Sequence, residues 1–184
     1  MDYFLGVPGL KQSYLVKMSE LAIWPPNLET RVATIPGTGD EPITWTSGRD
    51  TAKAMVRLLQ VPQGQWDEHT YISGETGTWN DAVQQLEKYH GISYPKLRLT
   101  KGITFKKVYI PISQTERIMA DADNPKYEDN PRELWTAYME EWQYSGASSV
   151  PTAITASQHT KFFSDLPFET ILTFLHRVKT TGKA

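Results

Sequence analysis

Apolar, β-branched and polar residues near the start of the chain follow a pattern typical of extended strands. Residues 31–35 and 43–46 are rich in valine, isoleucine, threonine and tryptophan, and a turn with two glycines lies between them at 36–42. Glycine adopts the positive φ that tight turns need at little steric cost. The pattern predicts that the two segments pair as a hairpin.

A helix, a strand and a second helix are predicted next. The carboxylate of Asp50 is expected to cap the first helix, which stops before Pro62. This helix would bury the apolar residues that follow the cap at helical spacing: Ala52, Ala54, Met55, Leu58 and Leu59. A third strand is predicted over residues 70–73. Thr78 is expected to cap the second helix, which ends at Gly91. The apolar face of that helix is formed by Val83, Leu86 and Tyr89.

Beyond Gly91 the pattern predicts peripheral strands at 96–100 and 107–110, followed by a short helix capped by Ser113. Residues 121–131 are expected to form a loop, with Pro131 in the first turn of the next helix. Five large residues share one face of that helix, and core packing is favoured over a ligand-binding stripe. These are Leu134, Trp135, Tyr138, Met139 and Trp142.

Two segments complete the chain. The small-residue stretch from Gly146 to His159 is expected to be a surface loop, with a lid over a substrate as the alternative. A closing helix is predicted from its apolar spacing, with basic residues at its negative end. Its apolar residues are Phe168, Ile171, Leu172, Leu175 and Val178.

Four short segments carry a family resemblance because they occur in a familiar order. They are Met1-Asp2-Tyr3-Phe4, Ile35-Pro36-Gly37-Thr38-Gly39-Asp40-Glu41-Pro42, Arg49-Asp50-Thr51-Ala52 and Ile72-Ser73-Gly74-Glu75. Together they resemble the C-terminal half of an NmrA-like, isoflavone-reductase-like protein, an atypical short-chain dehydrogenase. The resemblance implies an α/β fold: an incomplete doubly wound, Rossmann-like sheet that lacks its N-terminal nucleotide-binding half. Residues 1–95 would hold the late Rossmann-like elements, and residues 96–184 a small α+β subdomain on the substrate side.

The resemblance also implies a cofactor and a place for the substrate. Members of the family bind NADP or NAD, but the glycine-rich turn and the catalytic lysine lie upstream of the matched segments. Binding of the cofactor by this chain alone is therefore not expected. Tyr3 and Phe4 would line the substrate pocket, with packing beneath the sheet as the alternative. Trp24 is a further candidate for the pocket wall, with an exposed loop anchor as its alternative.

Other chemistries find little support in the residues. The glycines of Gly37-Thr38-Gly39 fit a hairpin turn better than a phosphate-binding loop, because Pro42 stands where a third glycine would be required. None of the nine tyrosines is followed four residues later by lysine, and no serine lies in a G-x-S-x-G motif. The histidines form no i, i+4 pair that could share a metal. His159, near Ser157 and Lys161, is the best candidate for a lone acid or base.

The composition of the chain limits the classes of partner that it is expected to bind. A formal net charge of −2 offers no cationic surface for nucleic acid or membrane lipids, and the basic run at 101–107 fits a solvated strand face better. The chain has no cysteine, and no apolar stretch approaches the roughly 18 residues that span a bilayer. A cytoplasmic location is expected.

Three functional hypotheses follow. The chain is the substrate-side portion of an NAD(P)H-dependent reductase acting on a small molecule, or part of a non-catalytic dinucleotide sensor of the NmrA type. The third is a truncated product without an independent role. Removing the first strands of a doubly wound sheet would expose unpaired backbone groups, so the isolated chain is expected to self-associate or fold loosely.

Overall fold

The computed structural model of the 184-residue chain describes residues 24–27, 30–90 and 104–181. A small sheet holds three strands in the order β1-β2-β5. The strands are β1 (Pro26–Asn27), β2 (Val32–Pro36) and β5 (Lys106–Ile110). β1 pairs antiparallel with β2, whereas β5 pairs parallel with β2, with Val32 opposite Lys106. Parallel neighbours that are distant in sequence are typical of α/β folds.

The predicted hairpin is wrong, because its two strands belong to different sheets. β3 (Ile43–Trp45) pairs antiparallel with β4 (Glu75–Gly77) in a second, two-stranded sheet. The turn between β2 and β3 does contain glycines with positive φ, at Gly37 and Gly39. The turn is bonded to elements other than β3: the backbone N–H of Gly37 donates to the carbonyl of Ile110 in β5, and the carbonyl of Gly39 accepts the backbone N–H of Asn80 in α2. The turn is therefore tied to a helix and does not return the chain along β2.

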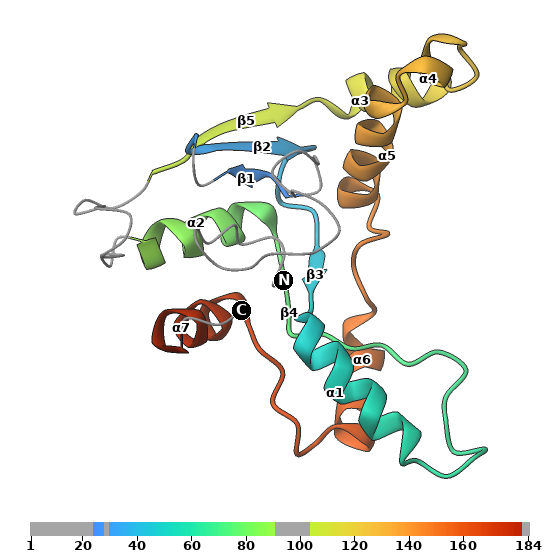
Figure 1. Cartoon of the computed structure of the whole chain (residues 1–184), viewed down its shortest axis with the longest axis vertical. Helices are drawn as coiled ribbons and strands as arrows, with labels where there is room; N and C mark the ends of the chain where they lie inside the picture. The colour runs from blue at the N-terminus through green and yellow to red at the C-terminus, as the bar shows by residue number, and fades with distance from the viewer. Residues whose placement is uncertain (1–23, 28–29, 91–103, 182–184) are drawn as a thin grey trace.

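Two helices cover the three-stranded sheet and form the main core (Figure 1). α2 (Trp79–His90) lies along the sheet, and α7 (Ile171–Thr181) packs beyond it; the hydroxyl of Tyr89 donates to the carbonyl of Leu175 at 2.6 Å. The apolar face predicted for α2 is confirmed, and so is that of α7 except at Phe168, which lies before the helix and packs against a second, smaller core. The buried core residues of the two helices are Trp79, Ala82, Val83, Leu86, Tyr89, Ile171, Phe174, Leu175 and Val178.

Thr78 caps α2 as predicted. Its hydroxyl accepts the backbone N–H of Asp81 at 3.1 Å, and the Asp81 carboxylate accepts the backbone N–H of Thr78 at 3.2 Å. Each residue thus satisfies a donor that the helix leaves without a partner. The proposed closing residue, Gly91, lies outside the described residues, as does the strand predicted at 96–100.

α1 (Gly48–Leu59) and α6 (Thr152–Phe162) form a second layer with a smaller core. The cap of α1 is Ser47, whose side chain accepts from the backbone of Asp50, so the capping role predicted for Asp50 is wrong. The predicted apolar face is right only in part, because Leu58 packs against the smaller core. Ala54 is buried, but Met55 and Leu59 are 61% and 74% exposed. Helical spacing identifies a face, but the neighbours that cover it are set by tertiary packing.

The remaining helices are α3 (Ile112–Ala120), α4 (Lys126–Asp129) and α5 (Arg132–Tyr144). The predicted helix before Asp121 is confirmed, but its cap is Pro111 and Ser113 lies within it. Pro131 precedes α5 as its cap residue. The core role predicted for the aromatic stripe of α5 is wrong: Trp135, Tyr138 and Trp142 are 63%, 42% and 51% exposed. Instead, α5 packs on α3 through the opposite face, which carries Ala137 and Glu140.

Three further predictions are corrected. Residues 70–73 form no strand, and β4 begins only at Glu75. Pairing with the segment of Trp45 starts at Gly74, whose backbone N–H donates to the carbonyl of Trp45. The expected loop between Gly146 and His159 is a helix from Thr152 onward, and the expected loop at 121–131 contains the single turn of α4. The alanines of α6 favour a helix. The hydroxyls of Thr155 and Thr160 in this helix donate to backbone carbonyls one turn earlier.

The described residues form a mixed α/β structure with two small sheets and seven helices. None of these helices combines the length and apolarity needed to cross a membrane.

Candidate functional site

A cavity of about 340 Å³ lies between the extended segment before β4 and one face of α6. We call it the His159 cavity. It is lined by Tyr71, Ile72, Ser73, Thr76, Thr152, Thr155, Ala156, His159 and Phe168. Concave sites of this size that mix apolar walls with a few polar groups are typical of small-molecule sites.

Gln158 of α6 holds the extended segment against the helix. Its side-chain oxygen accepts the backbone N–H of Tyr71 at 2.7 Å, and its amide nitrogen donates to the carbonyl of His69 at 2.6 Å. Gln158 is only 5% exposed, so these hydrogen bonds are shielded from water. The segment is fixed in position although it belongs to no strand.

The wall opposite α6 is built by β4 and the residues before it. The hydroxyl of Thr76 lies 3.0 Å from that of Thr44 and 3.3 Å from that of Ser73. Gly74 lies where a Cβ would collide with the carbonyl oxygen of Glu169, so only glycine allows this approach of the chain to the segment before α7. The hydroxyls of Thr44, Ser73 and Thr76 are thereby held beside the cavity.

His159 is the titratable side chain on α6 that faces the cavity. Its ring lies edge-on to Phe168, with centroids 5.2 Å apart, and its Nε2 is 3.2 Å from the carbonyl oxygen of Leu166. A carbonyl oxygen can only accept, so Nε2 carries the hydrogen of this bond. In the neutral ring Nδ1 is then an acceptor, and it makes no hydrogen bond to the described residues. Sequence reasoning singled out His159 but placed it in a loop, whereas a helix orients it.

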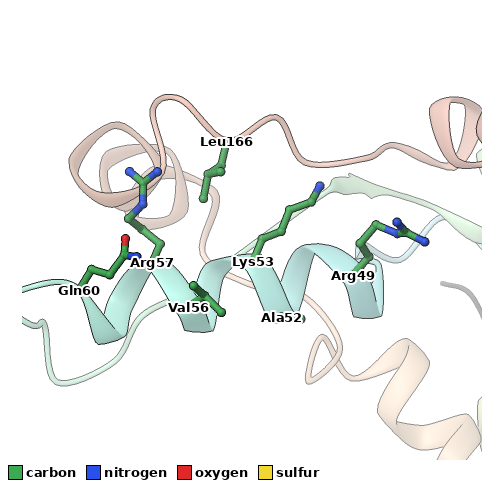
Figure 2. A pocket seen from close by; sticks show the side chains of 7 residues that line it. All are labelled: Arg49, Ala52, Lys53, Val56, Arg57, Gln60 and Leu166. Atoms are coloured by element: carbon green, nitrogen blue, oxygen red, sulfur yellow. The ribbon is translucent and has the colours of Figure 1, made fainter.

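A second cavity follows α1 and contains a row of cations. Figure 2 shows Arg49, Lys53 and Arg57 along the helix, with Leu166 facing it. Lys53 Nζ lies 2.8 Å from Asp50, and Arg57 forms two hydrogen bonds of 2.7 Å with Asp165. These carboxylates already pair two of the three cations, which weakens the case for an anion site here.

A third cavity, of about 360 Å³, lies between α3 and α5. Glu140 lines it and is 5% exposed; its carboxylate accepts the hydroxyl of Thr115 at 3.0 Å. Burial raises the pKa of Glu140, and the single hydrogen bond from Thr115 opposes this only in part. Sequence reasoning did not identify this carboxylate, because a glutamate in a helix gives no sign of its burial.

The turn with Gly37 and Gly39 is not open to a phosphate group. The carboxylate of Glu41 accepts the backbone N–H of Thr38 at 2.9 Å and of Gly39 at 2.8 Å. Burial acts to raise the pKa of Glu41, but the hydrogen bonds from Thr38 and Gly39 lower it overall. The Glu41 carboxylate therefore occupies the donors that a phosphate would need, although the hairpin predicted for this turn does not form.

Of the three residues predicted to line the substrate pocket, Trp24 is the one that lies within the described residues. Trp24 is partly buried against the main core, where its ring meets that of Trp79 edge-on with centroids 4.9 Å apart. It lines none of the three cavities above. Tyr3 and Phe4 lie outside the described residues. In the part of the chain that is described, no cluster of three or more His, Asp or Glu side chains could hold a metal.

Comparison with known proteins relates the chain to oxidoreductases. No family model matches it. It is 33% identical over 120 residues to oxidoreductase swnR of Arthroderma benhamiae, covering 65% of this chain and 38% of that protein. It is 28% identical over 171 residues to oxidoreductase swnR of Metarhizium robertsii, covering 92% of this chain and 48% of that protein. A shorter match, 28% identical over 76 residues, covers 41% of this chain and 25% of oxidoreductase BOA1 of Botryotinia fuckeliana. The chain thus spans less than half the length of these curated relatives, and it is similar to proteins named as oxidoreductases.

Proposed function

We propose that this chain is the substrate-side portion of an NAD(P)H-dependent oxidoreductase of the NmrA-like, isoflavone-reductase-like type. The observation that carries the proposal is the match to a protein named oxidoreductase along 92% of this chain. The parallel pairing of β2 with β5 is compatible with the α/β fold that such an enzyme requires.

The His159 cavity is the proposed substrate site. It combines apolar walls, several hydroxyls and one imidazole, and of the three cavities described above it is the one whose polar side chains are least engaged in ion pairs. Ligand sites commonly use a few such polar groups to orient a ligand that is held by apolar contact. The small-molecule substrate would be positioned here, and the chain would contribute specificity.

The described residues do not provide the phosphate site of a dinucleotide. The one glycine-containing turn that resembles such a loop is filled by the carboxylate of Glu41. No catalytic step through the cofactor is therefore assigned to these residues. In the proposed enzyme, a nicotinamide cofactor would supply the hydride, and the described residues would bind and orient the substrate.

The test begins with the native protein, recovered from its source cells with an antibody against this chain. Its intact mass is expected to exceed 20.9 kDa, the mass of the chain. Nicotinamide fluorescence should then show binding of NADPH or NADH, and a carbonyl substrate panel should reveal oxidation of the bound cofactor. A native protein that binds neither nucleotide would overturn the proposal. Binding without turnover of any substrate would overturn the enzymatic role and favour a dinucleotide sensor.

A further inference from the structure

The His159 cavity has no formal charge on its lining. All nine lining residues are apolar, hydroxylic or, in the case of His159, an imidazole. The nearby ions Lys161 and Asp67 pair with each other at 2.6 Å and do not line the cavity. A carboxylate, phosphate or ammonium group entering the cavity would lose water without gaining an opposite charge, which is strongly unfavourable.

The polar atoms of one wall act mainly as acceptors. The Thr155 hydroxyl donates its hydrogen to the carbonyl of Pro151 at 2.8 Å, so its oxygen keeps only lone pairs for a ligand. His159 donates through Nε2 to Leu166, which leaves Nδ1 as the acceptor of the neutral ring. A ligand that brings a hydrogen-bond donor would match both atoms.

The rest of the lining is suited to a compact apolar body. Ile72, Ala156 and Phe168 provide aliphatic and aromatic surface in the same cavity. Removing such surface from water favours binding but does not distinguish a hydroxyl from its methyl ether. Discrimination must therefore come from the acceptors.

We propose that the His159 cavity selects an uncharged, largely apolar compound that carries a hydroxyl group, and that His159 Nδ1 accepts the hydrogen of that hydroxyl. This assignment rests on the proposed role of the cavity as the substrate site. His159 is then a specificity-determining residue whose orientation is fixed by Leu166 and Phe168.

The experiment titrates the full chain with phenol, anisole and benzoate, followed by ligand-observed NMR. Phenol should bind about tenfold more tightly than anisole, since a polar site discriminates against an analogue that lacks the hydroxyl, and benzoate should not bind. In the ¹⁵N-labelled chain, the Nδ1 resonance of His159 should shift with phenol and not with anisole. This shift needs no variant, so it tests the proposal even if a substitution prevents folding.

Two variants give the matched comparison. His159→Phe keeps an aromatic ring but removes both ring nitrogens, including the acceptor Nδ1, so the preference for phenol over anisole should disappear. His69→Phe makes the same change at an exposed histidine outside the lining and should leave the preference intact. Equal binding of phenol and anisole to the unaltered chain, or tight binding of benzoate, would overturn the inference. If phenol is preferred but the native protein binds no nicotinamide nucleotide, the proposed oxidoreductase role fails and the binding site stands. If the native protein binds the nucleotide but the chain does not prefer phenol, only the present inference fails.

Discussion

The pKa values of two buried carboxylates in different regions of the molecule are shifted in opposite directions. Asp50, in the first turn of α1, is 0% exposed, and Glu140, in the middle of α5, is 5% exposed. Burial acts to raise the pKa of Asp50, yet hydrogen bonds from Glu169, Lys53 and Ser47 lower it overall. Burial raises the pKa of Glu140, and the bond from Thr115 does not reverse this.

The difference lies in the number and kind of donors around each group. The Asp50 carboxylate accepts the backbone N–H of Glu169 at 2.6 Å and the Lys53 ammonium at 2.8 Å, whereas the Thr115 hydroxyl donates to Glu140 at 3.0 Å. A charged or backbone donor favours the ionised form more than a single hydroxyl does. Burial alone therefore does not predict whether a carboxylate stabilises the fold; its donors decide.

The largest effect is expected from Asp50→Ala. The substitution removes the acceptor that joins α1 to the segment before α7 and leaves the Glu169 N–H buried, so it should reduce the free energy of unfolding by about 3 kcal/mol. Urea denaturation of the full chain measures the change. The control is Asp123→Ala at an exposed site, which should change stability by less than about 0.5 kcal/mol. Equal effects of the two variants would contradict the importance of the Asp50 network.

The effect of acid on stability should differ between the protein with Asp50 and a variant with a neutral side chain at this position. Because its folded-state pKa lies below the ordinary value of 3.8, the stabilisation from Asp50 is complete above pH 3.8 and is lost as pH falls below it. Asp50→Asn should lack this loss, so the two unfolding curves should converge by about 1–2 kcal/mol toward pH 2. Thermal unfolding by circular dichroism from pH 6 to pH 2 is the measurement. A constant gap across this range would show that Asp50 is not ionised in the folded protein.

Glu140→Gln should change stability in the other direction. The raised folded-state pKa means that ionisation of Glu140 destabilises the fold as pH rises above 4.5, the ordinary value for glutamate. The amide keeps an acceptor for Thr115 without a charge, so the variant should be more stable by about 1 kcal/mol at pH 7. Below pH 4.5 the gain should vanish. A less stable variant at pH 7 would mean that the ionised carboxylate has a favourable partner.

The smallest effect is expected from Lys53→Met. Lys53 is 41% exposed at its side chain, and half-exposed ion pairs contribute little, so the loss should not exceed about 0.5–1 kcal/mol. Urea denaturation at low and at high salt measures it. A loss as large as that of Asp50→Ala would assign the effect of Asp50 to the ion pair and not to the Glu169 backbone.

The predictions from sequence succeeded where local signals were sufficient. Helix α2 has both a cap at Thr78 and an apolar face, and both features were correct. They failed where a partner distant in sequence decided the outcome. The stripe with Trp135 and Trp142 is exposed because α5 packs on α3 through its other face, and β3 pairs with β4 instead of β2.

The candidate site shows the same division. The sequence alone determined that the chain carries His159, several nearby hydroxyl residues and no cysteine, together with the helical spacing of its closing element. Only the tertiary structure decided that His159 is oriented by Leu166 and Phe168 and that the Glu41 carboxylate fills the glycine turn. It also decided that the pKa of Asp50 is lowered whereas that of Glu140 is raised. The reason is physical: spacing along a chain sets local geometry, whereas hydrogen-bond partners and exclusion of water depend on segments far apart in sequence.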